Sequence, residues 1–162
     1  KQLGRDFFTD KLSSLCVGWL GDDISSIRMA AVANLGDLTE LFGTDWAIEY
    51  LLPPIAEMRL HSSYLRRLTA VQACAMISTK MEPEIGKIEL LPMVLELSTD
   101  SVANIRFNVA KGLEQMGPVY GQSVYVSQIR PVLNILIDDP DRDVRFFAEK
   151  SLKFLEGAIG SE

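Results

Sequence analysis

The feature that most constrains this chain is a register of 39 residues that recurs along its length. Arginines stand at positions 28, 67, 106 and 145, and prolines at 53, 92 and 131 keep the same step. Apolar columns share it, for example at positions 35, 74, 113 and 152. Several independent columns in one phase indicate a repeat protein, in which neighbouring units bury a continuous core between them.

Each unit contains two stretches with helical spacing of apolar residues. In the third unit Val102, Ile105, Val109, Leu113 and Met116 form one apolar stripe, which predicts an amphipathic helix. The same spacing predicts paired helices at 10–20 and 24–42, 49–59 and 63–81, 88–98 and 102–120, and 127–137 and 141–157. Short turns within each pair make the two helices antiparallel, so the fold class is an all-α, α-α superhelix.

The prolines and the segments between units carry further expectations. Each proline falls in the first turns of a first helix, where it is either tolerated or produces a kink. Ser14 replaces it in the first unit, so we expect that helix to be straighter. The segments 43–49, 82–89 and 121–128 are predicted to be short linkers. One apolar side chain in each, at Trp46, Ile85 and Val124, is expected to pack between adjacent units.

The unit boundaries follow from the register as a single array. The repeats are 10–48, 49–87, 88–126 and 127–162, and residues 1–9 match the end of a preceding repeat. We therefore expect the chain to be a fragment of a longer solenoid.

Composition argues against several functions. The formal net charge of -6 disfavours non-specific binding of nucleic acid. No apolar run approaches the roughly 18 residues that a membrane span needs. Cys16 and Cys74 lie in apolar helical patterns and in different columns, as expected of reduced thiols and not of a disulfide. Cytosol or nucleus is the expected location.

Catalytic and metal-binding patterns are weak. His61 is the one histidine, and it has no nucleophile at a recognisable spacing, so we expect no enzyme activity. Asp138, Asp139, Asp141 and Asp143 are interrupted by a proline and an arginine and lack the glycine and glutamate of a calcium loop. Helix capping explains these carboxylates better, and we expect no metal or cofactor.

The arginine column has two interpretations. Asp22 with Arg28, Asp100 with Arg106, and Asp139 with Arg145 repeat a six-residue spacing. In the first interpretation each arginine pairs with the aspartate of its own or a neighbouring unit and forms a structural ladder. In the second it binds carboxylates of a partner. Arg67 is expected to be freer for a partner, because its unit has His61 where the others have aspartate.

The turns within the units differ in sequence although the core columns agree. The variable positions include Ser25, Ser26, Tyr64, Val102, Asn104 and Asp141. In a solenoid such turns align as a ridge along one edge, which suits recognition of one partner. Tolerated surface variation is the alternative explanation.

The period, the helix pairs and the Asp-to-Arg spacing resemble HEAT repeats. The order of the segments also resembles the C-terminal repeats of the scaffolding A subunits of protein phosphatase 2A. The stretches that carry this resemblance are GRDFFTDKLSSLCVGWLGDDISSIRMAAVANL, SSYLRRLTAVQACAMIS, SVANIRFNVAKGLEQMGPV and IRPVLNILIDDPDRDVRFFAEKSL.

The resemblance implies a non-enzymatic scaffold. In that family the C-terminal repeats hold the phosphatase catalytic subunit through the turns, and N-terminal repeats receive the regulatory subunit. Carried over, Tyr64, Arg67, Val102 and Asn104 fall on the catalytic-subunit ridge, whereas Ser25 stands where the family often has an aromatic residue. The alternative is a HEAT adaptor for transport or chromosome organisation that binds a different protein cargo.

Overall fold

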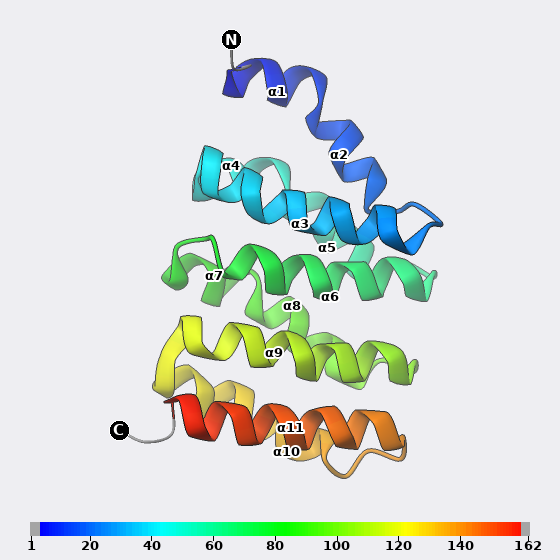
Figure 1. The fold of residues 1–162 in the computed structure, drawn as a ribbon, viewed down its shortest axis with the longest axis vertical. Helices are drawn as coiled ribbons and strands as arrows, with labels where there is room; N and C mark the ends of the chain where they lie inside the picture. The colour runs from blue at the N-terminus through cyan, green and yellow to red at the C-terminus, as the bar shows by residue number, and fades with distance from the viewer. Residues whose placement is uncertain (1–3, 160–162) are drawn as a thin grey trace.

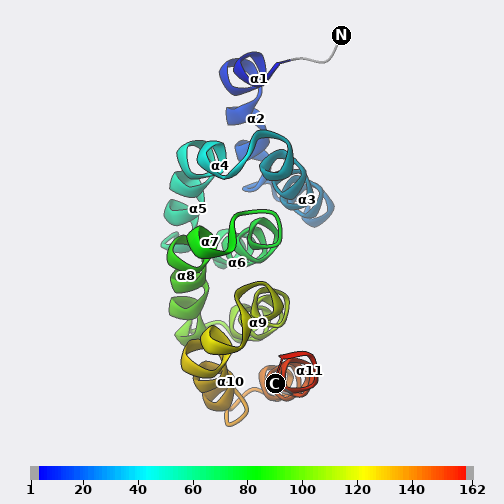
Figure 2. The ribbon, with the colours of Figure 1, turned by 90° about the vertical axis from the view of Figure 1, so that its left-hand side faces the viewer.

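The computed structural model describes residues 4–159, which form an all-α array of two layers (Figures 1 and 2). One layer holds the second helix of each repeat. These are α3 (Ser25–Phe42), α6 (Tyr64–Ser78), α9 (Ala103–Val124) and α11 (Arg142–Ile159). The other layer holds the first helices, each in two pieces. These are α1 (Arg5–Lys11) with α2 (Ser13–Trp19), α4 (Thr44–Tyr50) with α5 (Leu52–Arg59), α7 (Pro83–Glu89) with α8 (Leu91–Glu96), and η2 (Tyr125–Ile129) with α10 (Arg130–Leu136).

The segments predicted to be linkers are instead helical, and this prediction was wrong. Residues 44–50 form α4 and 83–89 form α7, so each is the first half of a bent first helix. The connection between repeats is much shorter and turns at Gly43 (φ 90°) and Gly121 (φ 78°), in a region that favours glycine. Helix α9 runs through Gly121 only as two helices that meet at a kink.

The bend in each first helix falls at the same register position. Leu12, Leu51 and Leu90 separate the two pieces in the first three repeats. Pro53 and Pro92 lie in the first turn of the second piece, where the missing N–H costs little.

The first repeat bends without proline, so the expectation of a straighter helix there was wrong. Ser13 Oγ donates a hydrogen bond of 2.6 Å to the Thr9 carbonyl, a back-bond that often bends helices. Helix α1 is in register with α4 and α7, which places residues 5–9 in the first helix of this repeat. The prediction that they end a preceding repeat does not match this position, and residues 1–3 lie outside the described residues.

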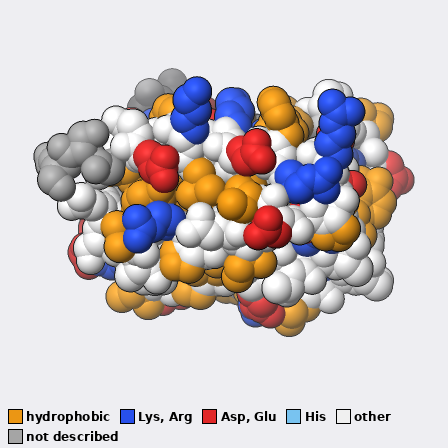
Figure 3. Space-filling model, turned by 90° about the horizontal axis from the view of Figure 1, so that it is seen from below, with side chains coloured by type: hydrophobic (Ala, Val, Ile, Leu, Met, Phe, Trp, Pro, Cys, Tyr) orange, Lys and Arg blue, Asp and Glu red, His pale blue; other side chains and the backbone are white. Residues whose placement is uncertain are grey.

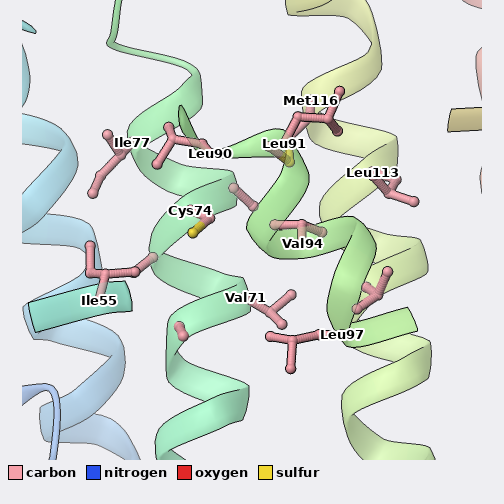
Figure 4. Close-up of a cluster of buried hydrophobic side chains, with 14 of the residues drawn as sticks. Ile55, Val71, Cys74, Ile77, Leu90, Leu91, Val94, Leu97, Leu113 and Met116 are labelled. Carbon is pink, nitrogen blue, oxygen red and sulfur yellow. The ribbon is translucent and has the colours of Figure 1, made fainter. Parts of the chain in front are cut away.

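The core lies between the layers and continues from repeat to repeat. Figure 4 shows side chains from α6, α8 and α9 meeting there, among them Val71, Val94 and Leu113, each at most 1% exposed. Cys74 is buried with them, and burial raises the pKa of its thiol to about 12, so it remains a neutral apolar group.

Two of the three residues predicted to pack between repeats are buried. Trp46 is 0% exposed and Val124 is 6% exposed, and Ile85 is partly buried against the same core. The Trp46 indole N–H also donates to Thr9 Oγ1 at 2.8 Å, which ties the second repeat to the first.

The C-terminal end of the array is chemically mixed. Seen from below, it shows hydrophobic side chains surrounded by charged side chains of both signs (Figure 3). Ile135 and Phe146, from α10 and α11, are among the exposed apolar residues. No helix among residues 4–159 combines the length and the apolar character needed to cross a membrane.

Candidate protein-interaction site: the turn ridge

The turns that join the two helices of each repeat line up along one edge of the array, the right-hand edge in Figure 1. We call this edge the turn ridge and define it as the turns at 20–24, 60–63, 97–102 and 137–141, together with the first helical turn that follows each. The connections between repeats lie along the opposite edge. The ridge therefore presents four successive turns to one side of the molecule.

A polar side chain fixes the backbone of each turn in the same way. Oδ1 of Asp22, Asp100 and Asp139 accepts a hydrogen bond from the N–H two residues on, at 2.8, 2.9 and 2.8 Å. In the second turn His61 Nδ1 accepts the equivalent bond from the Ser63 N–H at 2.9 Å. His61 thus replaces the aspartate as an acceptor within the turn, but it supplies no carboxylate.

The arginines at positions 28, 67, 106 and 145 stabilise the turns through hydrogen bonds to backbone carbonyl groups. Nη1 of Arg28, Arg67, Arg106 and Arg145 each donates to a backbone carbonyl six residues earlier, at 2.7 to 2.9 Å. These bonds satisfy carbonyl groups that the turns leave without helical partners. Every described turn is therefore closed by its own arginine.

Two arginines also reach the next repeat. Arg67 donates from Nε and Nη2 to the two carboxylate oxygens of Asp100, at 2.6 and 3.1 Å. Arg106 makes the same two-point contact with Asp139, at 2.7 and 2.8 Å. The side chains of these pairs are at most 16% exposed, so they are shielded from solvent far more than ordinary surface ion pairs.

The pairs shift the pKa values of their members. The hydrogen bond from Arg106 is the largest influence on the Asp139 carboxyl and lowers its pKa, and the hydrogen bond to Asp139 raises the pKa of Arg106. Burial alone would raise the pKa of Asp100, but hydrogen bonds from Arg67 and the Val102 N–H, with the nearby arginine charges, lower it overall. Both carboxylates are therefore favoured in their charged form.

The expectation for Arg67 needs correction. It is paired with Asp100 and is not free for a partner, because Arg67 and Arg106 each pair with the aspartate of the following turn. The replacement of aspartate by His61 consequently affects Arg28, the arginine of the preceding repeat. No carboxylate of the described residues forms an ion pair with Arg28 or Arg145.

The residues predicted to bind a partner differ in accessibility. Ser25, Ser26 and Tyr64 are exposed, and Tyr64 retains 43% of its surface. Val102 is partly buried against the core. Asn104 accepts hydrogen bonds from the Asn108 side chain at its backbone and side-chain oxygens.

The acidic turn at 138–143 acts as a helix start. Asp141 Oδ1 accepts hydrogen bonds from the N–H groups of Asp143 and Val144, at 2.9 and 3.2 Å, which caps α11. Within residues 4–159 no group of three or more histidine, cysteine or acidic side chains is arranged to hold a metal ion.

Sequence reasoning missed two apolar residues on the ridge. Leu60 is 69% exposed and Ile24 is 57% exposed. The register positions of Leu60 in the other repeats hold Gly21, Thr99 and Asp138, so an apolar residue there was a detectable signal. Tyr64 follows Leu60 closely in the chain, and tyrosine is among the residue types enriched at protein interfaces.

The chain matches a repeat family and is similar to subunits of protein phosphatases. The HEAT repeat family matches residues 90–120. The regulatory A subunit of protein phosphatase PP2A from Saccharomyces cerevisiae is 38% identical over 123 residues, 71% of this chain and 19% of the relative. The human beta isoform of the 65 kDa regulatory A subunit of serine/threonine-protein phosphatase 2A is 43% identical over 54 residues, 33% of this chain and 9% of the relative.

Among solved structures, that of Cex1p superposes with a TM-score of 0.71 at 17% identity, over 96% of this chain and 30% of the other. This likeness shows the fold alone. The chain spans about a fifth or less of the length of the relatives above, which are named as regulatory A subunits. The chain is thus a HEAT-repeat protein related to the regulatory A subunits of protein phosphatase 2A.

Proposed function

We propose that this chain is a non-catalytic scaffold segment that binds the catalytic subunit of protein phosphatase 2A through the turn ridge. In this role it positions the catalytic subunit relative to a regulatory subunit. The observation that carries the proposal is the contrast within the ridge. Its backbone is fixed by repeated hydrogen bonds, whereas its outward side chains differ from turn to turn.

A fixed backbone favours binding because little conformational entropy is lost when the partner docks. Each turn is held by a side-chain acceptor within the turn and by an arginine beneath it. The two cross-repeat ion pairs also fix the second, third and fourth turns relative to one another. The ridge can therefore present its contacts at a constant spacing.

The second turn is the best candidate for the centre of the contact. Leu60 and Tyr64 expose apolar surface there, and Arg66 is exposed beside them. Tyrosine and arginine are the residue types over-represented among the residues that dominate binding energy at interfaces. The relatedness to the A subunits of phosphatase 2A supports a partner from the same phosphatase.

Binding of the chain to purified phosphatase 2A catalytic subunit, measured by isothermal titration calorimetry, tests this function. Leu60→Ala and Tyr64→Ala should each lower the affinity by about tenfold, the cost of truncating a buried interface side chain. Leu41→Ala is a matched control, because Leu41 is 72% exposed but lies near the opposite edge, at the end of α3. It should leave affinity unchanged.

Equal losses from Leu41→Ala and Leu60→Ala would contradict the ridge as the binding surface. Failure of the wild-type chain to bind the catalytic subunit would contradict the choice of partner. A different protein cargo bound through the ridge would then favour the alternative role as a HEAT adaptor.

A further inference from the structure

The series of cross-repeat ion pairs has one unfilled position, between the first and second turns. Arg67 and Arg106 each direct an edge formed by Nε and Nη2 at the aspartate of the next turn. The next turn after Arg28 carries His61 at this register position. The His61 ring is held within its own turn by the Ser63 N–H.

The Arg28 side chain is buried, but only part of its guanidinium group has hydrogen-bond partners. Its residue exposure is 7%, and its Nη1 donates to the carbonyls of Asp22 and Asp23, at 2.7 and 3.0 Å. These contacts match those of Arg67 with its own turn, so the two guanidinium groups sit alike. Nε and Nη2 of Arg28 have no partner among the described residues, yet they are not among the polar atoms sealed from solvent. This edge therefore keeps some contact with solvent.

A second guanidinium, that of Arg66, lies against the same first turn. A Cβ atom built on Gly21 would lie 2.9 Å from Cζ of Arg66, so the Arg66 side chain covers the first turn. Arg66 and His61 also line a hollow of about 280 Å³ between the ends of the first two repeats. Glu57 lines this hollow as well, and Asp23 is exposed nearby. Two arginines with one unfilled acceptor position make this part of the ridge a site for a single negative charge.

We propose that a carboxylate side chain of the protein partner fills this position and pairs with Arg28 and Arg66. It takes the place that Asp100 and Asp139 occupy after the other arginines. The inference rests on the proposed function, because the partner is the one that docks on the turn ridge. A planar carboxylate matches the two-point geometry that Arg67 and Arg106 already show. The charge of Glu57 beside the hollow disfavours a doubly charged phosphate.

His61→Asp tests the site by filling it from within the chain. The new carboxylate can keep the hydrogen bond to the Ser63 N–H and pair with Arg28, as Asp100 does with Arg67. It should weaken binding to purified phosphatase 2A catalytic subunit by about tenfold or more, since a buried charge contact is lost and a like charge is added. His61→Asn keeps the acceptor without the charge, so its affinity should stay within about twofold of wild type.

A double-mutant cycle gives a second readout. Arg66→Gln should weaken binding by the wild-type chain and have a much smaller effect in the His61→Asp background, because both changes remove one interaction. Equal binding by wild type and His61→Asp would overturn the inference and leave the proposed function standing. Absence of wild-type binding would overturn both.

Discussion

Arg106 and Asp139 form a two-point ion pair between successive repeats, with Nε–Oδ2 and Nη2–Oδ1 distances of 2.7 and 2.8 Å. The same Asp139 accepts the Asp141 N–H, and the same arginine donates to the Asp100 carbonyl. One pair of side chains thus fixes two turns and the distance between them. Hydrogen bonds and ion pairs of this kind therefore fix the geometry of the turn ridge.

Removal of the Asp139 charge should destabilise the array. Asp139→Asn can still accept the Asp141 N–H but leaves Arg106 without a carboxylate in a site that is largely shielded. We expect a loss of about 1.5–3 kcal/mol in the free energy of unfolding, the range for a charge-assisted hydrogen bond. Urea denaturation followed by circular dichroism measures it.

Asp138→Asn is the control for this change, because Asp138 is adjacent and exposed. Its unfolding free energy should remain within about 0.5 kcal/mol of wild type. A comparable loss in both variants would show that the pair with Arg106 contributes little.

The cross-repeat pairs should make stability fall in acid. Asp100 and Asp139 have lowered pKa values in the folded chain, so each binds protons more weakly there than in the unfolded chain. Their contribution is fully present above the unfolded pKa of about 3.9 and is lost as pH falls through the folded pKa. The difference in unfolding free energy between wild type and Asp139→Asn should therefore shrink below about pH 4. A difference that stays constant down to about pH 2, below the unfolded pKa, would contradict this linkage.

Completion of the series should stabilise the chain. His61→Asp would give Arg28 the carboxylate that Arg67 and Arg106 already have, and we expect a gain of about 0.5–1.5 kcal/mol in the free energy of unfolding. His61→Asn, which brings no charge, should give no gain. Urea denaturation at neutral pH distinguishes them, and a less stable His61→Asp variant would show that the two turns do not approach as the later ones do.

Close packing between the last two repeats should make Gly117 intolerant of a side chain. A Cβ there would lie 2.5 Å from Cδ2 of the buried Leu155. Gly117→Ala should cost about 1–3 kcal/mol through overpacking. Gly157→Ala is the matched control in α11, because no atom beyond its chain neighbours and the backbone of its own helix lies within 4 Å of its Cβ position. Helix propensity predicts a gain of about 0.5–1 kcal/mol there, and thermal melting of both variants checks the opposite signs.

The sequence was sufficient to predict the repeat and its helix pairs because the fold is local. The same positions recur in every unit, for example that of Arg106 and those of the apolar residues Leu113 and Met116. The pairing partner of Arg67 was not predictable, because it depends on which turn lies closer in space. The register allows Asp100 of the next turn or a residue of its own turn equally well.

The first half of each bent first helix was missed for a different reason. Helices α4 and α7 are only seven residues long, too short for an apolar period to stand out, and a glycine or a proline stands at their start. The bend at Leu12 is accompanied by the hydrogen bond from Ser13 Oγ to the Thr9 carbonyl, and the spacing of apolar residues does not reveal such a bond. On the ridge, Tyr64 was predicted as a partner contact from its variable column, and its exposure is consistent with that role, whereas Leu60 was overlooked because it ends an apolar stretch.

Amide hydrogen exchange of the chain with and without the phosphatase 2A catalytic subunit tests binding through the turn ridge most directly. We predict slower exchange on binding in the turn ridge, at 20–24, 60–63, 97–102 and 137–141. The connections on the opposite edge, near Gly43 and Gly121, should be unchanged. Protection confined to that opposite edge, or no protection when the catalytic subunit is saturating, would contradict the ridge as the binding surface.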